Sequence, residues 1–150
     1  MKKLLIIKII ALMIGLSSIS YAQIVIVVNK SNPLNEISIN ELKQIFLAQR
    51  TSFQNGKSIE LAEYAKSKPK FYDQLFGWTV LKIKKHWMGL IFSGMHSSTP
   101  KEFKLASELI EYIQNNDGVI GFMDLSEVDK RVKTLLINGK SVNNRDYPLQ

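Results

Sequence analysis

Five β-branched residues in succession, Ile24 to Val28, constrain the fold of this 150-residue chain more than any other feature. An apolar run without alternation is typical of a strand covered on both faces, as in a parallel sheet between helices. Turn-forming residues end the run at 29–33, where the sequence reads Asn-Lys-Ser-Asn-Pro. We therefore expect this strand to lie inside a layered α/β domain.

Helices and further strands are predicted to alternate along the rest of the chain. Ser38 and Glu41 form a capping box at the start of one helix, and Thr99 and Glu102 form another. Ser67 is placed to cap a helix between these two. This alternation predicts a mostly parallel sheet flanked by helices, with ligands at the carboxyl ends of its strands. The predicted helices cover residues 39–48, 68–76, 80–91 and 100–115, and the predicted strands cover 24–28, 58–62, 119–123 and 132–137.

Two local features of the second half carry expectations of their own. Gly121 lies inside the apolar run 119–123. A glycine within a strand marks a bulge or a close approach of two backbones. The polar tail that ends at Gln150 is expected to be loosely ordered.

Residues 1–22 have the composition of a secretory signal peptide. A basic start is followed by an apolar run from Leu4 to Leu16, broken only by Lys8, and by a small polar region that ends in Ser-Tyr-Ala. The run is shorter than the roughly 20 residues that span a bilayer. We predict cleavage after Ala22, a mature domain of residues 23–150 and a periplasmic location. The alternatives are an uncleaved anchor or a buried N-terminal helix.

The composition excludes several classes of protein. The chain has no cysteine, which rules out a disulfide framework, zinc–thiolate sites and a cysteine nucleophile. Of the formal net charge of +7, three charges belong to lysines of residues 1–22, so the rest carries +4. This surplus favours anionic partners in general, but the lysines are spread out and we expect no nucleic-acid partner. The lysines of 66–70 and 82–85 are either solvated helix faces or a binding patch.

The sequence contains no complete catalytic or metal-binding constellation. Ser67 and Lys70 match the Ser-x-x-Lys pattern of penicillin-binding enzymes, but the pattern occurs again at 98–101 and its companion motifs are missing. His86 and His96 do not have the spacing of a metal-binding pair. We therefore expect no enzyme activity, no metal site and no cofactor.

Several short motifs follow one another in a recognisable order. They are Asn29-x-Ser31-Asn32-Pro33, Ile45-Phe46-Leu47, Ser67-x-x-Lys70, Trp87, Leu90-Ile91-Phe92-Ser93-Gly94, Pro100-Lys101-Glu102, Gly118-Val119-Ile120-Gly121-Phe122 and Tyr147-Pro148-Leu149. This order is similar to the short phosphate-binding-protein-like family, relatives of the periplasmic substrate-binding component of phosphate ABC transporters. The resemblance implies a type 2 periplasmic-binding-protein-like fold. Full proteins of that class have two lobes, whereas this chain has room for a single lobe.

The resemblance implies a site for a small oxyanion. Its candidate ligand-binding residues are Ser31 and Asn32 after the first strand, and Ser67 and Lys70 at a helix start. A helix N-terminus offers N–H groups and the positive end of its dipole to an anion. The chain has Lys70 where many relatives have arginine, and Pro69 lacks an N–H. The alternative is that these residues only cap the helix, face solvent or form turns.

Two hypotheses about function remain from the sequence. The first is a periplasmic solute-binding protein that holds phosphate or a similar small oxyanion without catalysis, with an ABC permease as its partner. The second is a one-lobed envelope module that pairs with another protein, or with a second copy as a homo-oligomer, and binds no small molecule.

Overall fold

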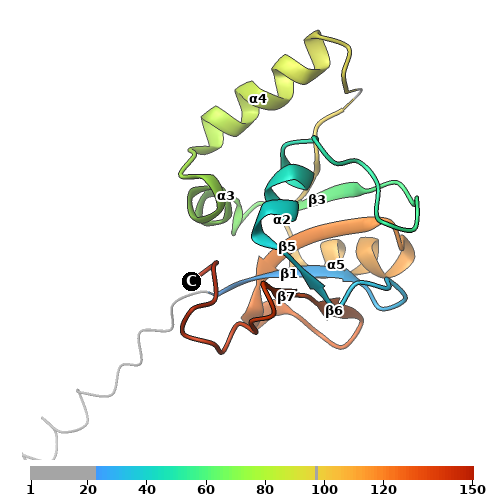
Figure 1. Cartoon of the computed structure of the whole chain (residues 1–150), viewed down its shortest axis with the longest axis vertical. Helices are drawn as coiled ribbons and strands as arrows, with labels where there is room; N and C mark the ends of the chain where they lie inside the picture. Colours follow the sequence, from blue (N-terminus) through green and yellow to red (C-terminus); the bar gives the residue numbers. More distant parts are fainter. Residues whose placement is uncertain (1–22, 97) are drawn as a thin grey trace, which may run out of the picture.

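A mixed five-stranded sheet forms the centre of the computed structural model, which describes residues 23–96 and 98–150 (Figure 1). The strands are β1 (Ile24–Asn29), β2 (Glu36–Ile37), β3 (Glu60–Tyr64), β4 (Lys101–Phe103), β5 (Val119–Asp124), β6 (Val132–Thr134) and β7 (Leu136–Ile137). The order in the sheet is β4-β3-β5-β1-β6. β3 runs parallel to β4 and β5, whereas β1 runs antiparallel to β5 and β6. β2 and β7 form a separate parallel pair.

Helices cover both faces of this sheet. The helices are α2 (Ile39–Phe46), α3 (Lys68–Phe76), α4 (Val80–Phe92) and α5 (Ala106–Asn115), with a short 3-10 helix, η2 (Leu125–Glu127), after β5. α5 packs on β1, β3 and β5, where its Ile113 lies against Gly121. Phe46 of α2 and Phe71 of α3 pack against Phe122, which points to the other face because side chains alternate along a strand. The structure thus confirms the predicted single α/β lobe, with mostly parallel pairings flanked by helices.

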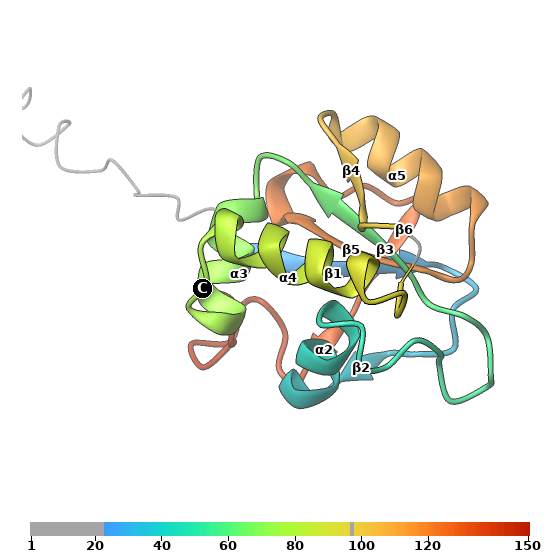
Figure 2. The same ribbon diagram turned by 90° about the horizontal axis from the view of Figure 1, so that it is seen from above.

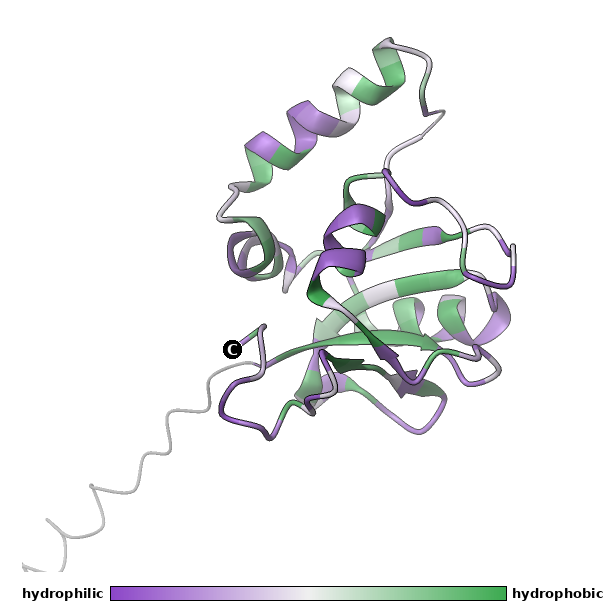
Figure 3. Cartoon of the chain, in the orientation of Figure 1, coloured by the Kyte–Doolittle hydropathy of each residue, from purple (hydrophilic) through white to green (hydrophobic). Residues whose placement is uncertain are grey.

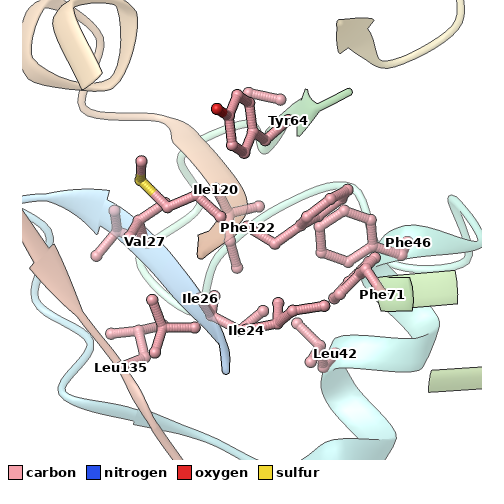
Figure 4. Close-up of a cluster of buried hydrophobic side chains, with 14 of the residues drawn as sticks. Ile24, Ile26, Val27, Leu42, Phe46, Tyr64, Phe71, Ile120, Phe122 and Leu135 are labelled. Carbon is pink, nitrogen blue, oxygen red and sulfur yellow. The ribbon is translucent and has the colours of Figure 1, made fainter. Parts of the chain in front are cut away.

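The first strand is buried as predicted. The residues from Ile24 to Val28 are at most 2% exposed, and they lie in one apolar cluster with Phe71 and Phe122, whose rings stack with centroids 3.8 Å apart (Figure 4). The parallel setting that we inferred from this burial does not apply to β1, which is antiparallel to both of its neighbours. Burial on two faces follows from cover by helices and carries no information about strand direction.

The start of α2 forms as the sequence predicts. The Ser38 hydroxyl accepts the Glu41 N–H at 3.1 Å, and the Glu41 carboxylate accepts the Ser38 N–H at 3.2 Å. This reciprocal pair satisfies two of the backbone donors that a helix start leaves open. The apolar side chains of Leu42, Ile45 and Phe46 are then buried on one face of the helix.

The second predicted capping box is wrong. Lys101–Phe103 form the edge strand β4, and the helix begins only at Ala106, after Leu105. β4 pairs in parallel with β3, and the Phe103 carbonyl accepts the Ala65 N–H at 2.9 Å. Pairing with an otherwise open sheet edge outweighs the local preference of the Thr99–Glu102 motif for a helix start.

The prediction of a loose C-terminal tail is also wrong. Tyr147 and Leu149 are 4% and 0% exposed, and both belong to the core. The Gln23 side-chain amide donates to the Val142 carbonyl at 3.2 Å, and Gln74 of α3 donates to the Gln150 carbonyl. The C-terminus therefore lies beside α3 (Figure 2).

The predicted signal peptide, residues 1–22, lies outside the described residues. Within 23–96 and 98–150, no helix has the length and apolar character needed to cross a membrane. The buried apolar residues of the described core run from Ile24 to Leu149.

Replacement of Gly121 by alanine tests the close approach that the sequence predicts. An added Cβ would lie 3.0 Å from the Ala62 carbonyl oxygen and 3.4 Å from Cδ1 of Ile113. We expect Gly121→Ala to lower the free energy of unfolding by about 2 kcal/mol, because the sheet must shift to admit the methyl group. Urea denaturation of residues 23–150 measures this.

The matched control is Gly89→Ala in α4, where nothing lies within 4 Å of an added Cβ. This substitution should stabilise the protein by about 0.5–1 kcal/mol, because alanine favours a helix interior over glycine. Equal effects of the two substitutions would contradict the close contact at Gly121.

Candidate functional site at the start of α3

The four predicted ligand-binding residues form two pairs, which lie at opposite ends of the strands of the sheet. Ser31 and Asn32 follow β1, while Ser67 and Lys70 follow β3. β3 runs parallel to β5 and β1 runs antiparallel to it, so the carboxyl ends of β1 and β3 point in opposite directions. The structure therefore does not bring the two pairs together. The expectation of a single site for all four residues depended on β1 running parallel to β3.

Ser31 and Asn32 have local partners in the turn after β1. The Ser31 hydroxyl donates to Oδ1 of Asn29 at 2.8 Å, and Asn29 donates its amide to the carbonyls of Ile113 and Gln114. Oδ1 of Asn32 accepts the Leu34 N–H at 2.9 Å, whereas its Nδ2, like the Ser67 hydroxyl, is buried and has no hydrogen-bond partner within the described residues. These are the contacts of Asx turns, which fix the chain locally and join it to the end of α5.

Ser67 occupies the N-cap position of α3 but does not cap it with its side chain. Its backbone is near the helical region, with φ −90° and ψ −12°, and its carbonyl accepts the Phe71 N–H at 2.9 Å. The hydroxyl is buried in a residue that is 3% exposed, and it makes no hydrogen bond within the described part of the chain. A buried hydroxyl without a partner costs about 1–3 kcal/mol. Ser67 is thus a polar group whose burial the local structure does not explain.

A charge cluster centred on the buried Glu63 lies beside Ser67. Glu63 at the end of β3 is 2% exposed, and its carboxylate is 2.6 Å from Nζ of Lys68. The Tyr72 hydroxyl donates to the same carboxylate. Lys68 also lies 2.9 Å from the carboxylate of Glu102 on β4. One lysine therefore joins two carboxylates from neighbouring strands at the start of α3.

Burial and charge oppose each other in this cluster. Burial raises the pKa of Glu63, and the hydrogen bonds from Lys68 and Tyr72 only partly offset it. Burial also opposes the charged form of Lys68, but its hydrogen bonds to Glu102 and Glu63 outweigh this effect and raise the pKa of Lys68. Lys68 stays charged while Glu63 becomes easier to protonate than an exposed glutamate.

A second ionic group lies at the same ends of β3 and β5. The Tyr64 hydroxyl donates to Glu127 at 2.9 Å. Lys66 lies 3.1 Å from Glu127 and 3.5 Å from Asp124, whose side chain is 6% exposed. Together the two groups pair four carboxylates, Glu63, Glu102, Asp124 and Glu127, with Lys66 and Lys68. The charge expected to attract an anion is thus largely balanced by the protein itself.

The roles of Lys68 and Glu102 could not be found from the sequence. The partner of Glu63 lies five residues later, across the junction of a strand and a helix. Glu102 was assigned to a helix start and instead lies on β4, in register with Glu63. That register is a property of the sheet and leaves no local signal.

Two hollows in the surface lie away from these residues. One of about 730 Å³ lies between the start of α2, β7 and the segment near Phe53, and its lining includes the Glu41–Arg50 ion pair. Another of about 410 Å³ lies along β3, beside Trp87 and His96. Neither contains a predicted ligand-binding residue. No group of His, Asp and Glu side chains within the described ranges has the arrangement of a metal site.

Solved structures of phosphate-binding proteins share this fold. The chain superposes on an ABC-type phosphate transport receptor from Vibrio cholerae with a TM-score of 0.63 and 17% identity, over 81% of this chain and 48% of that one. A putative phosphate ABC transporter substrate-binding protein with bound phosphate from Clostridium perfringens superposes with a TM-score of 0.64 and 15% identity, over 80% of this chain and 46% of that one. PstS from Borrelia burgdorferi superposes with a TM-score of 0.61 and 14% identity, over 85% of this chain and 53% of that one.

The fold is that of a phosphate-transporter binding protein at about half its length. No protein-family model matches the sequence, and no curated protein matches it. At these identities the likeness describes the arrangement of strands and helices. The ligand and partners of this chain have to be argued from its own residues.

Removal of Lys68 tests whether the buried cluster stabilises the fold. We expect Lys68→Met to lower the free energy of unfolding by about 3 kcal/mol at pH 7, because it leaves the Glu63 carboxylate buried without its cation. Burial holds the pKa of Glu63 in the folded protein above the ordinary value of a glutamate. Its contribution to stability is therefore greatest below the unfolded pKa and is lost as the pH rises through the folded pKa.

The loss in Lys68→Met should accordingly shrink when the pH is lowered to the acid side of the folded pKa, where Glu63 is protonated. Urea denaturation at a series of pH values measures it. Lys57→Met is the matched control, since its pair with Asp117 is exposed on both sides. The control should change stability little at any pH. A Lys68 effect that does not depend on pH would contradict the assignment.

Proposed function

We propose that the chain is an extracytoplasmic solute-binding lobe that holds phosphate or a similar small oxyanion at the start of α3, without catalysis. The observation that carries this proposal is the buried Ser67 hydroxyl, which has no partner in the described structure. It lies at the N-terminus of a nine-residue helix, where N–H groups and the helix dipole favour an anion. The likeness in fold to a protein with bound phosphate supports the same choice.

The anion must compete with Glu63 for Lys68. The Glu63 carboxylate already occupies the ammonium group of Lys68 at 2.6 Å, so a second anion nearby is repelled. Because burial raises the pKa of Glu63, mild acid removes this negative charge more readily than at an exposed glutamate. Protonation of Glu63 removes one of the two carboxylates that pair with Lys68 and leaves Glu102 at 2.9 Å, so the proposed site binds an oxyanion more tightly at lower pH.

Of the predicted ligand residues, Ser67 and Lys70 lie at the proposed site. Ser31 and Asn32 belong to the turn after β1 and have no part in it. Lys70 follows in the first turn of α3, and it adds positive charge to the same helix start. A periplasmic location after removal of residues 1–22, and an ABC permease as the protein partner, follow from this function as further proposals.

Titration calorimetry with sulfate tests the site, since sulfate keeps its charge over the pH range of interest. We expect Ser67→Ala to weaken sulfate binding about fivefold, because one hydrogen bond is lost. We expect Glu63→Gln to strengthen it about tenfold at pH 7, because the competing charge is removed while an oxygen remains for Tyr72. Phosphate is titrated in parallel to compare the two anions.

Ser31→Ala is the matched control, because Ser31 lies at the opposite end of the strands. This substitution should leave the affinity unchanged. Absence of heat with both anions at millimolar concentration would contradict the proposal. So would equal affinities of the Glu63→Gln variant and the unaltered protein.

A second candidate function is favoured by the surface of α4. Leu81, Phe92 and Met95 are 62%, 83% and 69% exposed. Exposed large apolar side chains that gather on one surface are typical of an interaction site. A one-lobed module that binds another surface in the envelope, and no small molecule, would use them. Absence of anion binding together with binding through α4 would favour this second function.

A further inference from the structure

α4 has two apolar sides, of which only one is covered by the protein. Ile83 and Trp87 are buried, at 1% and 3% exposed. Leu81, Met88 and Phe92 are exposed, at 62%, 37% and 83%. Spacings of seven and four residues place these three on one face of the helix, away from the buried pair.

The position of α4 leaves that second face open. α4 packs mainly on α3, and Nε2 of His86 lies 3.1 Å from the Leu47 carbonyl at the end of α2. In Figure 1 the helix lies along the outside of the molecule, away from the sheet, and Figure 3 shows hydrophobic residues at its far end. Met95, three residues after Phe92, continues the exposed apolar surface beyond the helix. We call Leu81, Met88, Phe92 and Met95 the outer stripe.

Lysines border the outer stripe on both sides. Lys84 and Lys85 are exposed, and each lies three or four residues from both Leu81 and Met88, on either side of the stripe. α4 contains no acidic residue. Among the described residues no carboxylate forms an ion pair with these two lysines. The helix therefore offers apolar and positive groups together, with no negative group of its own.

This combination complements a surface that is both apolar and negatively charged. A second copy of the chain meets only the first requirement, because pairing two α4 helices would bring lysines together without carboxylates between them. A bilayer of anionic lipid meets both, since its headgroups attract lysine and its acyl boundary accepts leucine, methionine and phenylalanine. We propose that α4 docks the protein onto an anionic lipid surface, with the outer stripe inserted at the headgroup boundary.

The geometry restricts the mode of binding. A helix of 13 residues is too short to cross the hydrocarbon core, so α4 lies parallel to the surface. The buried face, through Ile83 and Trp87, keeps the helix attached to the domain. The proposal does not depend on an oxyanion at α3, because Ser67 and Lys68 lie on a different helix start.

Vesicle sedimentation tests the proposal with residues 23–150, so that the apolar segment before them does not contribute. We expect binding to vesicles that contain phosphatidylglycerol, little binding to pure phosphatidylcholine, and a decrease with added salt. Phe92→Ser should weaken binding about tenfold through loss of inserted apolar area. The double variant Lys84→Glu and Lys85→Glu should weaken it at least about tenfold.

The matched control is the double variant Lys30→Glu and Lys130→Glu, which makes the same change in net charge at exposed sites outside α4. It should bind nearly as well as the unaltered protein. Circular dichroism and thermal melting confirm that every variant is folded.

Several outcomes would overturn the proposal. Equal binding to charged and neutral vesicles, no binding to either, or equal losses in both double variants would each do so. Analytical ultracentrifugation supplies the remaining alternative: a dimer that Phe92→Ser dissociates, without vesicle binding, would make the outer stripe an interface between two copies.

Discussion

The antiparallel pairing of β1 with β5 determines how the rest of the molecule is arranged. It places the continuous apolar run from Ile24 to Val28 in the middle of the sheet, between β5 and β6, where every residue of the run is buried. The same pairing reverses β1 relative to β3. The loop after β1 and the start of α3 therefore lie at opposite ends of the strands. Any ligand bound at α3 must be held without contacts from Ser31 or Asn32.

Features that depend on neighbouring residues were predictable from the sequence. The capping box of Ser38 and Glu41 forms with both of its hydrogen bonds, because the interacting groups are three residues apart. Gly121 marks a close backbone approach, because only glycine lacks the Cβ that would meet the next strand. The alternation of strands and helices gave the layered α/β lobe, which the solved phosphate-binding structures share.

Features that depend on distant residues were not predictable in the same way. The direction of β1 is a property of its hydrogen-bonded neighbours, and its own side chains are equally apolar in either direction. The segment around Lys101 has a good helix-start pattern, yet it completes the edge of the sheet beside β3. In the candidate site, Ser67 was identified because a serine before a helix is a local signal. The Lys68 link between Glu63 and Glu102 depends on the register of β3 with β4, which the sequence does not display.

The burial of Leu149, at 0% exposed, has a consequence for how the domain is made. Synthesis supplies β1 long before Leu149, although both belong to one apolar cluster. Until residue 149 is available, that cluster has an unfilled position and the chain can pack only incompletely. The apolar run of β1 is thus present in a partly packed chain throughout translation, the period in which exposed apolar segments are most prone to aggregation. Complete packing around β1 therefore has to wait for a segment that is synthesised long after it.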